Sequence, residues 1–306
     1  MNASIQQDGN GHGTTSTDIS SSLQSGSLNE SKSLNILEMM SGARSIEGSN
    51  ELLPTVVPRI MAFNPVEGSE ELLPAGLPRI SCLKDINKVI DTLVEWVDDH
   101  PIDDYVYTFR NTRMGSPLTS DNVLYMFEHK DMCVAGSAAL KHVIDILPTS
   151  PYHVFPKTWK NNDIDLFLLG KPFPSRMNTG SDLDIVCSPE KTVEELLLGF
   201  DLPACRVAFD FQMNIFISAQ AIYSIYERRM NIPIYLKEKE TMRIIMDKAS
   251  NESCKEIKEV LINRFYERVK KYVGRGFGVK WIRTSEIIPW IKILCHYAVN
   301  YKRKHH

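Results

Sequence analysis

The chain has 306 residues, of which 43% are hydrophobic, and a formal net charge of −3. The hydrophobic share is sufficient for a buried core, whereas the charge argues against a protein that holds nucleic acid by bulk positive charge alone. The six cysteines form no CxxC pair or Cys/His group with zinc-ligand spacing, which fits a reducing compartment. There is no signal-peptide pattern and no uncharged apolar run near the roughly 20 residues of a membrane span. We therefore expect a soluble cytoplasmic or nuclear protein that does not associate with membranes.

Two segments are predicted to precede the folded core. Residues 1–46 are rich in Ser, Gly, Asn, Gln and Thr and are predicted to be a disordered tail, because they cannot bury enough apolar surface to offset the entropy of ordering. Residues 47–82 contain a two-copy repeat, EGSxELLPxxxPRI, that begins at Glu47 and again at Glu67. Two prolines per copy favour an extended linker. The repeat is either a duplication within a linker or a tandem docking motif whose ELLP leucines bind a protein partner.

Residues 83–210 are predicted to form an α/β core, followed by a mostly helical part over residues 211–306. Helical spacing of apolar residues predicts a helix over 85–99, and Ser120 or Asp121 caps a second one over 120–129. The next elements are predicted as strand 131–135, helix 136–147, strand 163–169, strand 181–187, helix 188–200 with a capping start at Ser188, and strands 205–209 and 214–218. Helices are predicted over 218–229, 241–249, 252–273 and 285–299. Strands that alternate with helices indicate a mixed α/β fold.

The Gly136-Ser137 pair follows a predicted strand and opens a predicted helix. Glycine lets backbone amides approach an anion closely, and the serine hydroxyl can donate a hydrogen bond to it. The N-terminus of a helix also favours negative charge through its dipole. The pair is therefore predicted to bind phosphate.

Asp163 and Asp165 stand at the start of the apolar strand in WKNNDIDLFLLG. Residues i and i+2 of a strand point to the same face, so two carboxylates would project side by side. Such close like charges repel each other, and either solvent or a metal ion must make the arrangement tolerable. Two carboxylates can hold one or two Mg²⁺ ions beside phosphate oxygens, with Mn²⁺ as a substitute. Asp201 in GFDLPACRV is the best candidate for a third metal ligand.

The order of these motifs resembles the DNA polymerase beta-like nucleotidyltransferase superfamily. A strand leads into hG[GS] at a helix start, and [DE]h[DE] lies on a following strand, over roughly residues 130–210. FDLPACRVAF is similar to a divergent branch of that superfamily, in which an FD-x-x-x-C run supplies the last strand. The resemblance implies a mixed sheet with flanking helices.

The resemblance also implies roles for particular residues. Gly136 and Ser137 would bind the nucleotide phosphates, Asp163 and Asp165 would be catalytic metal ligands, and Asp201 would help to deprotonate the acceptor hydroxyl. Two departures concern these residues. The segment between Ser137 and Asp163 is longer than in compact members, and Asp201 lies before a proline at the mouth of a strand.

A second Gly-Ser pair and a second pair of aspartates occur in GSDLDIV, with Asp182 and Asp184. Here the glycine directly abuts the acids, and no helix separates them as it does in the first motif. We therefore interpret these two aspartates as outward residues of a half-solvated strand, and the alternative is that they are the true metal pair.

A basic stretch follows in the helix predicted over 252–273. Arg264, Arg268, Lys271 and Arg275 recur at spacings that can line one helical face. The stripe is either simply solvated, or Arg268, Lys271 and Arg275 bind the triphosphate or a nucleic-acid backbone.

The sequence favours a metal-dependent nucleotidyltransferase. Such an enzyme would move a nucleoside monophosphate from an NTP to an unidentified hydroxyl acceptor on protein, RNA or a small molecule. The alternative is a catalytically inactive protein of the same fold that acts as an interaction or nucleotide-binding module, with the ELLP repeats recruiting its partners.

Overall fold

The structure is a computed structural model that describes residues 73–110, 131–147, 159, 164–172, 175–178, 183–212, 214–249 and 257–284. Several predictions lie outside these residues: the tail over 1–46, the first repeat copy, the helices over 120–129 and 285–299, and the positions of Asp163 and Asp182. Within the described residues, no helix is long and apolar enough to cross a membrane.

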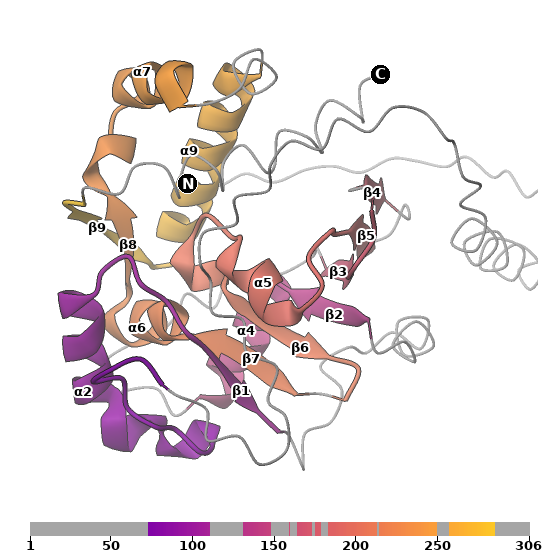
Figure 1. The fold of residues 1–306 in the computed structure, drawn as a ribbon, viewed down its shortest axis with the longest axis vertical. Helices are drawn as coiled ribbons and strands as arrows, with labels where there is room; N and C mark the ends of the chain where they lie inside the picture. The colour runs from indigo at the N-terminus through magenta and orange to yellow at the C-terminus, as the bar shows by residue number, and fades with distance from the viewer. Residues whose placement is uncertain are drawn as a thin grey trace, which may run out of the picture. The chain divides into compact units, whose positions relative to one another are not determined.

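A seven-stranded mixed sheet forms the centre of the fold (Figure 1). Its spatial order is β1-β7-β6-β2-β3-β5-β4. The strands are β1 (Val106–Phe109), β2 (Met132–Ala135), β3 (Ile164–Leu168), β4 (Ser175–Asn178), β5 (Leu183–Cys187), β6 (Val207–Asp210) and β7 (Ile215–Ser218). Only β3 and β5 pair in parallel, and the other neighbours are antiparallel. The predicted mixed α/β fold is thereby confirmed.

Helices cover both faces of this sheet. On one face, α4 (Ser137–Ile146) buries Ala139, Leu140, Val143 and Ile144 and packs on β2, β3 and β6. On the other, α5 (Val193–Leu198) leads to Phe200, whose ring lies 5.8 Å from that of Phe167 between centroids. Asp165 shares the face of Phe167, because the two are i and i+2 on one strand. The predicted acid therefore projects from the face that α5 and Phe200 cover.

The helix predicted over 188–200 is shorter in the structure, where α5 begins after Thr192. The Thr192 hydroxyl accepts a hydrogen bond from the Glu195 amide at 3.2 Å, and the Glu195 carboxylate accepts one from the Lys191 amide at 2.8 Å. Thr192 thus caps a first-turn amide of α5, while the Glu195 carboxylate reaches back to the amide just before the cap. The predicted start at Ser188 was therefore wrong.

The C-terminal part is not only helical. α6 (Ala219–Glu227) is buried along almost its whole length, and α2 (Ile86–Asp99) packs against it. Beyond α6, β8 (Arg229–Pro233) and β9 (Gly278–Ile282) form a separate parallel pair, with η3 (Ile234–Leu236), α7 (Lys239–Ala249) and α9 (Lys258–Gly274) between them. The strands β1, β4, β8 and β9 were all missed from the sequence, because each has only four or five residues and no clean apolar alternation.

The folded part begins before the predicted boundary at residue 83. Leu77 and Ile80, from the second repeat copy, are buried. The carbonyl of Ala75 accepts a hydrogen bond from the Trp96 indole at 3.1 Å. Gly76 turns the chain there with a φ of +81°, and the first copy has Val56 at the corresponding position. Because a β-branched residue disfavours positive φ, only the second copy is suited to this turn.

Candidate functional site

The turn at Gly136 joins β2 to α4, as the sequence predicts. Gly136 has φ +79° and ψ −136°, a conformation that favours glycine over any residue with a Cβ. Its amide donates to the Val207 carbonyl at 3.0 Å, and its carbonyl accepts from the Leu140 amide at 2.9 Å. Because the Gly136 amide is used by the sheet, an anion at this turn would meet the first-turn amides of α4, which begins at Ser137.

Asp165 lies beside this turn. In the antiparallel pairing of β2 with β3, Asp165 is the partner of Ala135, the residue that precedes Gly136. The side chain of Asp165 is 25% exposed. The predicted phosphate-binding turn and one of the predicted metal ligands therefore share one end of the sheet, while Asp163 lies outside the described residues.

Asp184 is the direct neighbour of Asp165 on the next strand. The parallel register of β3 and β5 pairs the two residues, and paired residues of adjacent strands project from the same face. Strands lie about 4.8 Å apart, so the two carboxylates repel each other. The sequence analysis interpreted Asp184 as an outward residue of a half-solvated strand and did not predict that it pairs with Asp165.

Arg176 on β4 joins both acids. Its Nη2 donates to Asp165 Oδ1 at 2.8 Å and also to Asp184 Oδ2, and its Nε donates to Asp184 Oδ2 at 3.0 Å. We call Asp165, Asp184 and Arg176 the strand-end cluster. One guanidinium charge opposes two carboxylates, so the formal charge of these three side chains sums to −1.

The strand-end cluster offers oxygen donors that suit a divalent cation. Its two carboxylates are the hard oxygen donors that Mg²⁺ prefers. Asp184 Oδ1 is buried and accepts no hydrogen bond from the described residues, an arrangement that costs free energy unless a donor or cation occupies it. Among the described residues, no three His, Cys, Asp or Glu side chains are grouped as a metal site. The donor chemistry of these two carboxylates thus fits Mg²⁺ or Mn²⁺.

Asp201 has a different environment from the one predicted. Its side chain is only 4% exposed and forms an ion pair with Arg268 of α9. The structure therefore pairs the predicted third metal ligand with a predicted nucleotide ligand. This contact joins α9 to the segment between α5 and β6. A metal ion at Asp201 would have to displace Arg268, so its role as a ligand stays a prediction.

The other predicted basic residues do not form one solvated stripe. Arg275 lies just past the end of α9 and is 7% exposed. Its guanidinium carbon is 4.7 Å from the Trp159 ring centroid and 4.9 Å from that of Tyr272, which is a cation–π arrangement. Lys271 is exposed. Nucleotide binding by Arg268, Lys271 and Arg275 stays a prediction, and for Arg275 aromatic packing accounts for the position.

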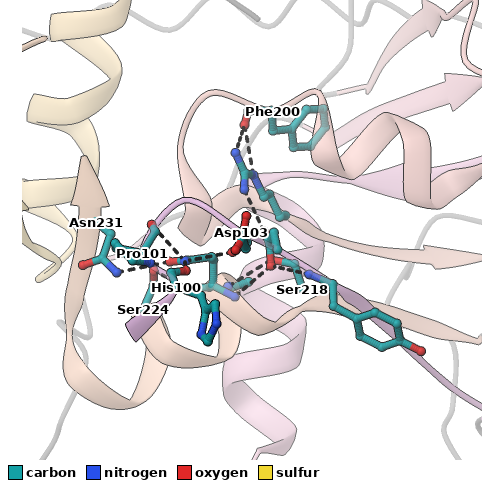
Figure 2. Close-up of polar contacts among 12 residues, drawn as sticks. His100, Pro101, Asp103, Phe200, Ser218, Ser224 and Asn231 are labelled. Carbon is teal, nitrogen blue, oxygen red and sulfur yellow. Dashed lines mark hydrogen bonds and ion pairs between the residues drawn. The ribbon is translucent and has the colours of Figure 1, made fainter. Parts of the chain in front are cut away.

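The FDLPACR segment connects several parts of the fold (Figure 2). Arg206 donates to the Phe200 carbonyl through Nε at 3.1 Å and Nη2 at 2.9 Å, and its Nη1 contacts Asp104 at 2.7 Å. Asp104 Oδ1 also accepts from the amides of Tyr105 and Gln220, both at 3.0 Å. The motif that carried part of the family resemblance thus has a structural explanation: it anchors the chain before β1 to the sheet.

Gln220 extends the network shown in Figure 2. Its side-chain nitrogen donates to the carbonyls of Pro101 and Asp103, both at 3.1 Å, and its side-chain oxygen accepts from Asn231 at 3.3 Å. Buried polar groups of this kind stabilise one arrangement of the chain when each has a partner. The network links α6 and β8 to the chain that leads into β1.

Comparisons of the chain with protein-family models, with curated proteins and with solved structures gave no match.

Proposed function

We propose that the protein is a metal-dependent nucleotidyltransferase that moves a nucleoside monophosphate from an NTP to a hydroxyl acceptor. The acceptor oxygen loses its proton and bonds to the α-phosphorus, the α–β phosphoanhydride bond breaks, and pyrophosphate leaves. The observation that carries the proposal is the shared sheet end of a phosphate-suited turn and an acidic pair. Asp165 is the register partner of the residue before Gly136, and Asp184 is its neighbour on β5. The resemblance of the sequence motifs to the polymerase beta-like superfamily supports the same conclusion.

Asp165 and Asp184 would hold Mg²⁺ or Mn²⁺, together with Asp163 as the sequence predicts. When bound, the metal supplies positive charge against the phosphates and the oxygens of the attacking and leaving groups. The chain itself contributes orientation. The first turn of α4 offers its amides and dipole to phosphate oxygens, and Ser137 adds a hydroxyl. Asp184, rather than Asp201, is the additional carboxylate that we favour, since Asp201 is ion-paired with Arg268.

The alternative is an inactive protein of this fold that binds nucleotides or partners. The observation that favours it is Arg176, whose guanidinium already contacts both acids. In that case the strand-end cluster would be a structural ion-pair network, and the repeat over residues 47–82 would remain the main candidate for partner binding.

Nucleotide binding and transfer test the proposal. Wild type is incubated with each labelled NTP in the presence of Mg²⁺ or EDTA, with itself, RNA or a cell extract as acceptor. The same assays are run on Asp165→Asn, Asp184→Asn and Asp201→Asn. Asp98→Asn is a matched control, because Asp98 forms an exposed ion pair with Lys280 elsewhere on the surface.

The expected result is Mg²⁺-dependent NTP binding that falls at least tenfold in Asp165→Asn and Asp184→Asn and is unchanged in Asp98→Asn. Retained binding in Asp201→Asn supports the assignment of the additional ligand to Asp184. Equal NTP affinity in wild type, Asp165→Asn and Asp184→Asn would contradict the proposed enzyme activity. The inactive interaction or nucleotide-binding module would then be the better interpretation. Metal-dependent binding without any transferred label would also favour the module.

A further inference from the structure

Arg176 is held by the two acids on an edge strand. Among the strands that the structure describes, β4 is the last of the sheet and pairs only with β5. The Arg176 side chain is 45% exposed, whereas those of Asp165 and Asp184 are 25% and 15% exposed. The arginine therefore lies on the solvent side of two more buried carboxylates, on an element that has a single neighbour in the sheet.

The charges of the strand-end cluster decide what it attracts. Without a metal, Asp165, Asp184 and Arg176 sum to −1, which repels a polyphosphate. One divalent cation on the carboxylates raises the sum for these three side chains to +1, and the rise of two charges is the same if Asp163 also binds the ion. An arginine cannot lose its proton in a protein, so its charge remains after its contacts to the carboxylates are replaced. A guanidinium displaced from carboxylates finds its next best partner in phosphate oxygens, which match its planar donors.

We propose that Arg176 is a built-in counter-ion that exchanges partners during substrate binding. In the metal-free protein it binds Asp165 and Asp184. When a divalent cation takes these carboxylates, the guanidinium is released to bind the phosphates of the NTP. This inference rests on the proposed function, and it makes nucleotide binding depend on prior or simultaneous metal binding. Arg176 is then a substrate-positioning residue whose contacts differ between the metal-free and the loaded protein.

The experiment uses the full chain and Mn²⁺ alone as the first probe. Mn²⁺ binding is measured by electron paramagnetic resonance in wild type, Arg176→Gln and Arg176→Lys. The matched control is Arg229→Gln, because Arg229 is similarly exposed and is paired with Glu227. A far-ultraviolet circular dichroism spectrum and a urea midpoint for each variant establish that it is folded.

Arg176→Gln is expected to bind Mn²⁺ about tenfold more tightly than wild type. One unit charge a few ångströms from a divalent ion in salt solution changes a binding constant by roughly that factor. Arg176→Lys, which keeps the charge, and Arg229→Gln are expected to match wild type. In a second measurement at saturating Mn²⁺, Arg176→Gln is expected to bind the NTP about tenfold more weakly, because the phosphates lose a charged partner.

An arginine with a purely structural role would not raise Mn²⁺ affinity and lower NTP affinity when it is replaced by glutamine. If wild type binds Mn²⁺ and Arg176→Gln binds it equally or more weakly, the exchange of partners by Arg176 is overturned. The metal site of the proposed function is not affected by that result. Unchanged NTP affinity at saturating Mn²⁺ would also overturn the exchange of partners. If no variant binds Mn²⁺, the proposed function itself fails, and this outcome is distinct from the other two.

Discussion

Replacement of Asp104 by alanine is expected to destabilise the fold strongly. The Asp104 side chain is 4% exposed and the Arg206 side chain 6% exposed, so their ion pair is almost fully removed from water. Alanine at position 104 would remove the carboxylate that contacts Arg206, and the amides of Tyr105 and Gln220 would lose this acceptor. Loss of one partner of a buried pair costs about 3–5 kcal/mol. Since the total free energy of unfolding of a domain is about 5–15 kcal/mol, this loss is a large share of it.

The assay is urea unfolding followed by circular dichroism, with the slope compared between variants. Asp104→Ala is expected to lose about 4 kcal/mol, and Asp104→Asn less, because an amide oxygen can still accept from both backbone amides. Asp98→Asn is the matched control: Asp98 is exposed and its partner Lys280 is half-buried near the surface, and surface pairs contribute below about 1 kcal/mol. If the free energy of unfolding of Asp104→Ala falls by less than about 1 kcal/mol at an unchanged slope, the reasoning is refuted. Water would then be able to solvate the Arg206 charge in place of Asp104.

Two further substitutions test the fold outside the candidate site. Gly76→Val is expected to cost about 2 kcal/mol, because a β-branched residue is strained at a φ of +81° and its Cβ would lie 3.4 Å from Trp96; an unchanged urea midpoint would contradict the turn described. The pKa of His142 is lowered below its usual 6.5, since burial disfavours the imidazolium. The unfolded chain therefore takes up this proton first, and the contribution of His142 to stability is present above about pH 6.5 and is lost as the pH falls through the folded-state pKa. His142→Phe is expected to lose less stability than wild type between pH 7.5 and pH 5.5, and equal losses in melting temperature would show that another group is responsible.

Local patterns in the sequence were sufficient for the central elements. Burial of a segment against the core gives a pattern of apolar residues within about ten consecutive positions. This pattern is visible as apolar runs in β2 and β3 and as helical spacing in α2 and α4. Gly136 was predictable for the same reason, because a strand that turns directly into a helix needs a residue that tolerates positive φ. The mixed α/β class follows from the order of these elements along the chain.

Only the tertiary structure decided which charged residues meet. Strand register pairs Asp165 with Asp184, and the pairing of β4 with β5 brings Arg176 to both, although nothing local in a four-residue edge strand indicates its neighbours. Asp201 and Arg268 contact each other from segments 67 positions apart, so no spacing rule relates them. The periodicity of apolar residues indicates which face of a helix or strand is buried. Which charged side chains form ion pairs depends instead on how elements that are distant in the sequence pack together. No short stretch of sequence contains that information.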